Sequence, residues 1–469
     1  MQKIDFNKIK KIHLIGIKGQ GMSAVASILK KRGFKITGSD VSEKFFTDEV
    51  LKKEKISYYE EFDSEYITDD IDLVIYSTAY NEKNNPEFKK AKEIGLKMMS
   101  YPEILGILFK EKFGIAVCGT HGKTTTSALA AYVLEECGLD PSAVIGSKVI
   151  NWGSNSLSGK GKHMVIEADE WQNKLAMYDA KGVILTSIDF DHPDFFKDFK
   201  DYKKVFQDFV AKIGKEGFLV FCQDDKDVVE VSKYAQCREL SYGFSKISDF
   251  VIKNFKLNKN FDYTLQKANQ SFEVYYKNKS LGSFRLKLIG KHNALNATSV
   301  IALSHLLRVD LEKARKALED FKGTARRFEY YGKRNGALLF DDYGHLPKEI
   351  KVVLKTARNF YPKRDIISVF QPHSFSRTES LLPEFAGSFD DADEVVVLDI
   401  YGSARETSGN VHSKDLVDSI NKDNSNKAKY IPTIPEVVDY LKDRIGKDDV
   451  VIAIGAGSGW EVVEELSKG

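Results

Sequence analysis

Short apolar runs separated by amphipathic stretches characterise the N-terminal part of the chain. The run KIHLIGI at 11–17 leads into the Gly-rich GIKGQGMS, and the helical pattern AVASILKKRG follows. Two more apolar runs, KITGSD at 35–40 and DLVIYSTAY at 72–80, precede a helix predicted over YPEILGILFKEK at 101–112. This alternation of strand and helix is typical of a parallel sheet.

The middle of the chain begins with another apolar run, FGIAVC at 113–118, and a Gly-rich turn. The runs HMVIEADE at 163–170 and KGVILTSIDFDH at 181–192 predict two further strands. Apolar and polar residues then alternate over 251–288, which predicts antiparallel hairpins. A helical pattern over 292–307 closes this region.

A third region returns to the alternation of strand and helix. Its strands are expected at 336–343, 365–372, 393–401 and 449–457. With 469 residues, of which 42% are hydrophobic, the chain is too long for one ordinary domain. The sequence therefore predicts three α/β domains, at 1–108, 109–322 and 323–469.

Charge is nearly balanced, since 70 basic and 68 acidic side chains give a formal net charge of +2. This gives no overall reason to expect nucleic acid or an anionic membrane as a partner. The four cysteines form no C-x-x-C pair, which favours free thiols in a reducing compartment. Neither a signal peptide nor an apolar run long enough to span a bilayer is recognisable, so we expect a cytoplasmic protein.

The turn GTHGKT at 119–124 stands between an apolar run and an Ala-rich helical pattern. Its two glycines allow successive backbone N–H groups to face one oxyanion, and the helix start adds partial positive charge. Lys123 can then reach the β- and γ-phosphates of a nucleotide, and the Thr124 hydroxyl can ligate Mg²⁺. Only two residues separate the glycines, fewer than in the standard motif, and the alternative is a Gly-rich turn with a solvated lysine. The strand, the G-K-T and the helix together favour a phosphate loop.

Acidic side chains follow two of the apolar runs in the middle region. They are Glu167, Asp169 and Glu170 after the first run, and Asp189 and Asp191, with His192, after the second. Ligands of open α/β sheets bind at the carboxyl ends of strands, and a hard cation on phosphates needs oxygen ligands. We therefore select Glu167 as a metal ligand and His192 as a ligand of a second metal ion. Each carboxylate alone is more typical of a cap or a turn, and the combination with Lys123 is what favours metal ligation by Glu167 and His192.

Asn293 and Asn296 stand three apart in the helical pattern that closes the middle region, so they share one helix face. Their amides can hold a base, or water near the phosphates. Asn293 is equally suited to be the N-cap of that helix.

The order of these motifs resembles that of the Mur ligases of peptidoglycan synthesis. The matching stretches are GIKGQGMS, GTHGKTTT, EADE, DFDHPD, HNALNA, FKGTARRFE, DDYGH and FQPHSFSRT, which together span nearly the whole chain. The resemblance implies a Rossmann-like UDP-binding domain, a central P-loop-type ATPase domain with extra antiparallel strands, and a C-terminal Rossmann-like domain. It implies that ATP phosphorylates a muramoyl carboxylate, and that an amine then attacks the acyl phosphate to release phosphate.

The resemblance assigns roles to residues that match the motifs. Lys123, Glu167, His192 and Arg327 are expected to be catalytic, and metal ligands are expected at Thr124, Glu167 and His192. ATP is expected at Gly119, Thr120, His121, Gly122, Lys123, Thr124, Thr125, Asn293, Asn296, Arg327, Asp342 and Tyr343. The UDP-sugar is expected at Gly16, Gly19, Gly21, Met22, Ser23, Asp40 and Ser77, and the amino acid at His345, His373 and Arg377.

Within the family, the motifs favour the branch that joins L-alanine to UDP-N-acetylmuramate, with ATP and two Mg²⁺ ions, in cell wall synthesis. The implied partners are these small molecules, and the protein is expected to be a monomer or a homodimer. EADEWQ and LTSIDFDHPDFF lean toward a sister ligase that attaches a whole tripeptide in recycling. Lys18 and Gln20 stand where Gly and Ala are usual, which predicts altered contacts with the diphosphate.

Two other classes of function fit the sequence less well. A nicotinamide-dependent oxidoreductase would use the first Gly-rich turn, but G-x-x-G-x-G is not its fingerprint, and Lys123 and Arg327 would have no role. A catalytically silent nucleotide-binding protein would be expected to have lost Lys123, Glu167, His192 or Arg327, and all four are in place. His163, His305 and His412 have no chemical neighbours in the sequence, so we expect no catalytic role for them.

Overall fold

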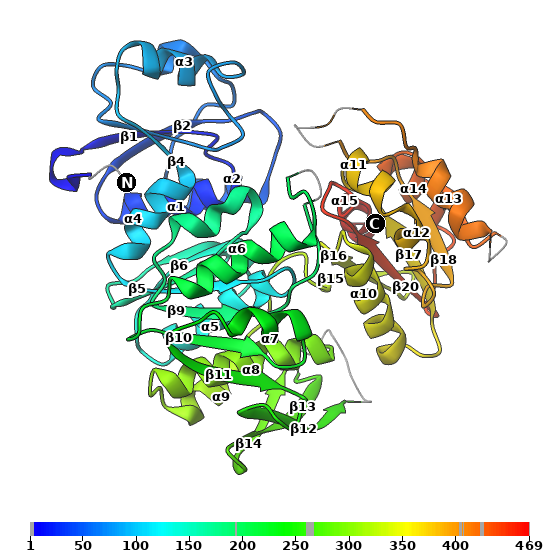
Figure 1. Ribbon diagram of the computed structural model, residues 1–469. Coiled ribbons are helices and arrows are strands. Elements are labelled where there is room, and N and C mark those ends of the chain that lie inside the picture. Colours follow the sequence, from blue (N-terminus) through cyan, green and yellow to red (C-terminus); the bar gives the residue numbers. More distant parts are fainter. Residues whose placement is uncertain are drawn as a thin grey trace.

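The computed structural model describes residues 4–192, 195–258, 267–402, 406, 408–422 and 426–468. Three sheets follow one another along the chain, and helices flank them (Figure 1). The predicted fold class, three α/β domains, is confirmed. Part of the stretch predicted to form hairpins, 259–266, and residues 193 and 194 of the DFDHPD motif lie outside the described residues.

The first sheet is parallel and has the order β2-β1-β3-β4. Its central strand β1 is buried because it is apolar and has a neighbour on each side. The strands are β1 (Lys11–Ile15), β2 (Lys35–Ser39), β3 (Leu73–Tyr76) and β4 (Met98–Ser100). The helices are α1 (Gln20–Lys31), α2 (Phe46–Lys53), α3 (Pro86–Glu93) and α4 (Tyr101–Lys110).

The middle sheet is mixed and has the order β14-β13-β12-β11-β10-β9-β5-β8-β6-β7. Strand β5 lies between the parallel strands β8 and β9, so the carboxyl ends of these three strands meet at one edge. The predicted antiparallel hairpins are present as β12, β13 and β14. The strands are β5 (Phe113–Cys118), β6 (Ser142–Val149), β7 (Ser154–Ser158), β8 (His163–Glu167), β9 (Gly182–Leu185), β10 (Phe218–Cys222), β11 (Arg238–Gly243), β12 (Phe250–Leu257), β13 (Gln270–Tyr276) and β14 (Lys279–Leu286). The helices are α5 (Lys123–Glu136), α6 (Phe199–Ala211), α7 (Lys226–Ser232), α8 (Lys291–Leu306) and α9 (Leu311–Asp320).

The third sheet has the order β15-β16-β20-β17-β18-β19 and is parallel except for its edge strand β15. The strands are β15 (Glu329–Arg334), β16 (Ala337–Asp342), β17 (Asp365–Phe370), β18 (Glu394–Val397), β19 (Ala428–Tyr430) and β20 (Asp449–Ile454). The helices are α10 (Pro347–Phe360), α11 (Phe375–Ser380), α12 (Leu382–Ala386), α13 (Ser413–Asn421), α14 (Ile434–Leu441) and α15 (Glu461–Lys468).

Several strands were not predicted from the apolar pattern. Strand β7 has the sequence SNSLS and pairs with β6, while β15, EYYGKR, lies at a sheet edge and β19 has only three residues. Such strands are held by backbone pairing to a neighbour rather than by an apolar face, so their sequences carry little signal.

The first two domains share one cluster of buried apolar side chains, and most of the third domain's buried apolar side chains form clusters of their own. One cluster contains residues from Ile9 to Phe321 and joins the first two domains. The third domain has clusters on the two faces of its own sheet, one of which also includes Ile289 of the middle domain. In Figure 1 this third domain, yellow to red, stands beside the other two.

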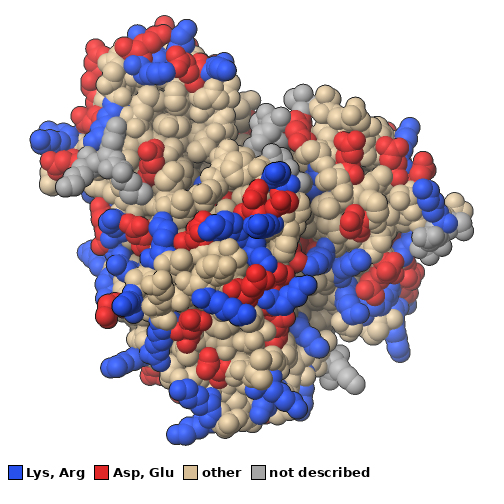
Figure 2. Space-filling view, in the orientation of Figure 1, with Lys and Arg blue, Asp and Glu red and all other residues tan. Residues whose placement is uncertain are grey.

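Helix α1 of the first domain packs against β6 and β7 of the second, which explains the shared cluster. On the face shown in Figure 2, basic and acidic side chains are interspersed. Across the described ranges, every helix is too short or too polar to cross a bilayer.

Candidate active site

The turn after β5 has the backbone geometry of an anion cradle. Gly119 and Gly122 have φ angles of +126° and +78°, in the region that favours glycine. A Cβ at Gly119 would lie 2.4 Å from Thr186 Oγ1, and one at Gly122 would lie 2.8 Å from Asn296 Oδ1. Helix α5 begins at Lys123, directly after the second glycine, so its free N–H groups face the turn.

Lys123 lies over this turn rather than in solvent. Its Nζ donates to the carbonyls of Gly119 and Thr120 at 2.6 and 3.1 Å and to Glu170 Oε2 at 3.0 Å. Burial opposes the charge, but the buried Glu170 carboxylate outweighs burial and raises the pKa of Lys123 above its usual range. The lysine is therefore a fixed cation at the place where a phosphate would bind.

Two groups of oxygen ligands lie next to the turn. The Thr124 hydroxyl donates to Glu167 Oε1 at 2.8 Å. Asp169, Glu170 and His192 each offer a ligand atom, and these atoms all lie within 4.8 Å of one another. The predicted ligands therefore lie in two groups, Glu167 with Thr124 and His192 with Asp169 and Glu170. Carboxylate and hydroxyl oxygens are the donors that Mg²⁺ prefers, so Thr124, Glu167, Asp169 and Glu170 fit this ion, and His192 adds a nitrogen to the second group.

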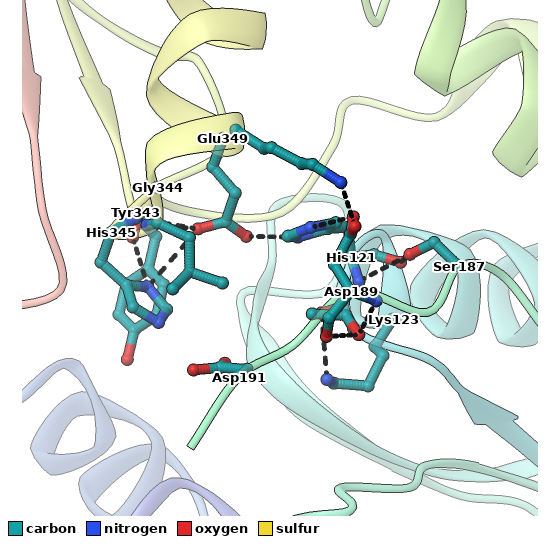
Figure 3. A network of polar contacts seen from close by, with 12 residues as sticks. His121, Lys123, Ser187, Asp189, Asp191, Tyr343, Gly344, His345 and Glu349 are labelled. Atoms are coloured by element: carbon teal, nitrogen blue, oxygen red, sulfur yellow. Dashed lines mark hydrogen bonds and ion pairs between the residues drawn. The ribbon is translucent and has the colours of Figure 1, made fainter. Parts of the chain in front are cut away.

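The C-terminal domain reaches the phosphate loop through His121 (Figure 3). His121 Nε2 lies 3.0 Å from Asp189 Oδ2, and Nδ1 lies 3.1 Å from Glu349 Oε1 at the start of α10. Burial would lower the pKa of His121, but the two carboxylates raise it to about 9. Lys348, next to Glu349, also forms an ion pair with Asp189. Two residues of the third domain thus contact the nucleotide side of the second.

The residues predicted to hold the amino acid gather at the same junction. Arg377 Nη2 donates to Asp191 Oδ1 at 3.2 Å, and Nη1 lies 3.2 Å from His373 Nδ1. The ring centres of His345 and His373 are 6.1 Å apart. Burial would raise the pKa of Asp191, but His192 and Arg377 lower it to about 2. Burial lowers the pKa of His345 to about 4, so this imidazole is neutral at pH 7.

Two adjacent arginines of the segment before β15 differ in their contacts. Arg326 donates to Asp341 Oδ2 at 3.0 Å and to the carbonyl of Gly455 at 2.6 Å, which fixes it within its own domain. The guanidinium carbon of Arg327, the residue predicted to reach ATP, lies 5.2 Å from the ring centre of Tyr343. Cation–π contact at this distance holds Arg327 beside the DDYGH turn.

Other residues predicted to bind ATP are Asp342, in the DDYGH turn, and Asn293 and Asn296, in helix α8. The buried Asp342 carboxylate accepts from the backbone N–H groups of Phe328 and Gly344, both at 2.8 Å. Asn296 Nδ2 donates to Asn293 Oδ1 at 3.2 Å. Helix α8 begins at Lys291, so Asn293 is not its N-cap.

Two hydroxyl residues of the phosphate loop are also buried. Thr120 is fixed by bonds to the backbone of Asp189, and Thr125 lies in the first turn of α5. Thr120 and Thr125 are therefore both held in place within or next to the loop that is predicted to hold ATP.

The Gly-rich turn of the first domain connects β1 to α1. Its predicted residues are clustered there or at the ends of the neighbouring strands, namely Gly16, Gly19, Gly21, Met22, Ser23, Asp40 and Ser77. A Cβ at Gly16 would lie 2.7 Å from the Tyr80 ring, and one at Gly21 would lie 2.4 Å from the Tyr101 hydroxyl. Asp40 accepts from the backbone N–H of Lys18 at 2.7 Å.

Lys18, which stands where a glycine is usual, does not point its side chain into the turn. Its Nζ is fully buried and lies 3.1 Å from both Asp48 and Glu60. We expected the Lys18 side chain to alter contacts with a diphosphate, but it points away from the turn and toward Asp48 and Glu60. The backbone of Lys18, not its ammonium group, is what lines the turn.

Comparison with known proteins agrees with this geometry. Family models match the chain in three stretches: the Mur ligase family catalytic domain at 11–113, the middle domain at 117–304 and the glutamate ligase domain at 326–457. A UDP-N-acetylmuramate–L-alanine ligase of Caldanaerobacter subterraneus is 39% identical over 99% of this chain and 98% of its own length. The chain belongs to the Mur ligase family.

Two solved structures resemble this Mur ligase over its full length. The UDP-N-acetylmuramate–alanine ligase of Thermotoga maritima is 28% identical and superimposes with a TM-score of 0.82, covering 98% of both chains. A murein peptide ligase of Psychrobacter arcticus is 22% identical with a TM-score of 0.74, also over 98% of both chains. At that lower identity the likeness concerns the fold alone.

Some residues of this Mur ligase site were not predicted from the sequence. Glu349 and Lys348 contact His121 and Asp189 from another domain, and Glu170 is the carboxylate that holds Lys123. Glu170 stands in the EADE motif that the sequence did mark, but Glu349 carries only the signal of a helix start after a proline.

Proposed function

We propose that this Mur ligase joins L-alanine to UDP-N-acetylmuramate with hydrolysis of ATP to ADP and phosphate, in the cytoplasm. The observation that carries the proposal is the convergence of the phosphate loop, two groups of acidic ligands and the C-terminal His and Arg residues at one interdomain junction. Figure 3 shows His121 and Lys123 of this junction beside Glu349 and His345. The Caldanaerobacter relative and the Thermotoga structure described above bear the name of the alanine-adding enzyme, which supports the choice of substrate.

The ATP half of the reaction uses the middle domain. Lys123 and the loop N–H groups bind the β- and γ-phosphates, and Arg327 adds charge from the C-terminal domain. The groups Thr124–Glu167 and Asp169–Glu170–His192 would hold one Mg²⁺ ion each. These ions supply charge neutralisation on the phosphates. The muramoyl carboxylate oxygen attacks the γ-phosphorus, ADP leaves, and an acyl phosphate results.

The acceptor half uses the C-terminal side of the junction. Arg377 binds the carboxylate of the amino acid, since a guanidinium suits this anion in a bidentate arrangement. His345 and His373 line the same pocket, where burial keeps His345 neutral, and the ammonium group gives its proton to water. The free amine attacks the carbonyl carbon, the C–O bond to phosphate breaks, and an amide forms. The first domain holds the UDP part on the turn that contains Gly16, Gly19 and Gly21, with Asp40 and Ser77.

Release of phosphate with different acceptors tests this function. The purified protein, as a monomer or homodimer, receives ATP, Mg²⁺ and UDP-N-acetylmuramate with L-alanine, glycine, L-serine or the muramyl tripeptide singly. We expect the highest kcat/KM with L-alanine. Release only with the tripeptide would assign the protein to peptide recycling instead. ATP hydrolysis that ignores every UDP-sugar, or no turnover at all, would favour a silent nucleotide-binding protein.

A further inference from the structure

Glu349 belongs to two structural units at once. It is the third residue of α10, and its Oε2 accepts from the backbone N–H groups of His345 and Leu346 at 2.9 and 3.2 Å. These bonds cap the helix and fix the DDYGH turn before it. Its other oxygen, Oε1, lies 3.1 Å from His121 Nδ1 in the phosphate loop of another domain. One carboxylate therefore connects the C-terminal turn to the nucleotide loop.

His121 has little freedom to turn away from this contact. Its backbone N–H donates to Ser187 Oγ at 2.9 Å, and its second ring nitrogen lies 3.0 Å from Asp189 Oδ2. Because both ring nitrogens face a carboxylate, the ring donates on both sides and is an imidazolium. The charged groups around this pair are Asp189, Lys348 and Arg327, contributed by both domains, and the neutral His345 lies beside them.

The His121–Glu349 contact is the better shielded of the two ion pairs at this place. Its side chains are 24% and 15% exposed, whereas Lys348 in the neighbouring pair with Asp189 is 70% exposed. Exposed pairs are screened by salt and contribute little, so the buried contact carries more of the docking free energy.

We propose that Glu349 is a positioning residue that docks the C-terminal domain on the phosphate loop through His121, so that Arg327 and Tyr343 are set against the bound ATP. The proposal rests on the proposed ligase function for its kinetic readout. The residue touches neither substrate nor metal in this role and acts through His121.

The variant Glu349→Gln separates docking from capping. Glutamine also accepts the backbone hydrogen bonds of a helix start, so α10 keeps its cap while the charge facing His121 is lost. We expect the KM for ATP to rise about tenfold, the KM for UDP-N-acetylmuramate to stay unchanged, and kcat to fall. Since the His121 imidazolium loses one partner, the alkaline limb of the kcat/KM profile for ATP moves to lower pH.

Glu436→Gln is the matched control. Glu436 is the third residue of α14 in the same domain, and its carboxylate accepts from the N–H and hydroxyl of Thr433 at 3.2 and 2.7 Å. It is exposed, so we expect wild-type kinetics and a wild-type pH profile. An equal loss in Glu349→Gln and Glu436→Gln would show that only helix capping matters and would overturn the proposal.

A double variant and a binding assay complete the test. His121→Asn combined with Glu349→Gln is expected to have the same KM for ATP as His121→Asn alone, because one contact is removed either way. Losses that multiply in the double variant would overturn the proposal. Binding of a fluorescent ATP analogue is measured beside turnover. Equal affinity in the wild type and Glu349→Gln would contradict the docking role, whereas a wild type that binds ATP but forms no amide would contradict only the ligase function.

Discussion

The middle domain contacts its two neighbours in different ways, through apolar side chains on one side and through ion pairs at the nucleotide loop on the other. Toward the first domain, α1 packs on β6 and β7, and buried apolar side chains continue from one domain into the next. Toward the C-terminal domain, the contacts at the nucleotide loop are His121–Glu349, Asp189–Lys348 and Asp191–Arg377. Apolar burial has no alternative partner in water, whereas charged groups can exchange one another for phosphates and metal ions.

This difference indicates which interface takes part in catalysis. The first and middle domains act as one body that carries the UDP-sugar turn and the phosphate loop. We expect the C-terminal domain to separate from this body and return, because its contacts at the nucleotide loop are ionic. The nucleotide site lies at the separable interface, where movement admits substrates and closure excludes water.

The largest effect is expected at the junction itself. Lys123→Ala removes the fixed cation of the phosphate loop, so we expect kcat for phosphate release to fall by about 10³-fold or more. Glu170 loses its partner and becomes protonated, which leaves the fold in place. Circular dichroism confirms folding, and kcat is measured with L-alanine. A folded variant that retains turnover would contradict the assignment of the loop.

The apolar interface is tested next with Phe109→Ala. Helix α4 packs on β3 and β4 of the first sheet and continues past the predicted boundary after residue 108. The fully buried Phe109 ring at its end contacts the ring of Tyr178 in the middle domain, with centroids 6.1 Å apart. We expect a loss of about 3–5 kcal/mol of unfolding free energy. Hydrogen exchange should show the first and middle domains losing protection together. Phe389→Ala, in the core of the C-terminal domain, is the control and should weaken that domain alone.

Arg377→Ala tests the acceptor side of the polar interface. We expect the KM for L-alanine to rise about 100-fold, because a buried charge pair with the carboxylate is lost. The KM for ATP should change far less. Arg377→Lys keeps the charge but cannot form two parallel hydrogen bonds with a carboxylate, so an intermediate KM for L-alanine is expected. An equal rise in both KM values would place Arg377 outside the acceptor site.

The smallest effect is a dependence of docking on pH. The pKa of His121 is raised to about 9 in the docked structure, above its ordinary value, so the ring favours docking when it is protonated. Asp189 stays beside His121 when the domains separate, so only the part of the rise in pKa that Glu349 causes favours docking. This part is present at neutral pH and is lost as the pH rises through about 9. Proteolysis of the segment between α9 and β15 at pH 6 to 10 measures it. His121→Asn should remove the pH dependence, and an unchanged profile in this variant would contradict the explanation.

Much of the fold and of the phosphate loop could be predicted because the signals are local. An apolar strand, two glycines and a helix start within GTHGKT are sufficient to specify the turn. Contacts between distant segments could not be predicted. Lys18 turns inward because Asp48 and Glu60 lie beside it in space, and Glu349 reaches His121 although 228 residues separate them. No local pattern in the sequence predicts either contact.

Distances between spin labels test the contrast between the two interfaces most directly. Exposed positions on three helices, Lys89 in α3, Lys316 in α9 and Asp418 in α13, are changed to labelled cysteines in pairs, after the native cysteines are replaced by serine. We expect a single narrow 89–316 distance under all conditions. We expect a 316–418 distance that broadens when salt is raised to about 1 M and narrows again with an ATP analogue and Mg²⁺. A 316–418 distance that stays fixed, or an 89–316 distance that broadens equally, would contradict the contrast between the two interfaces.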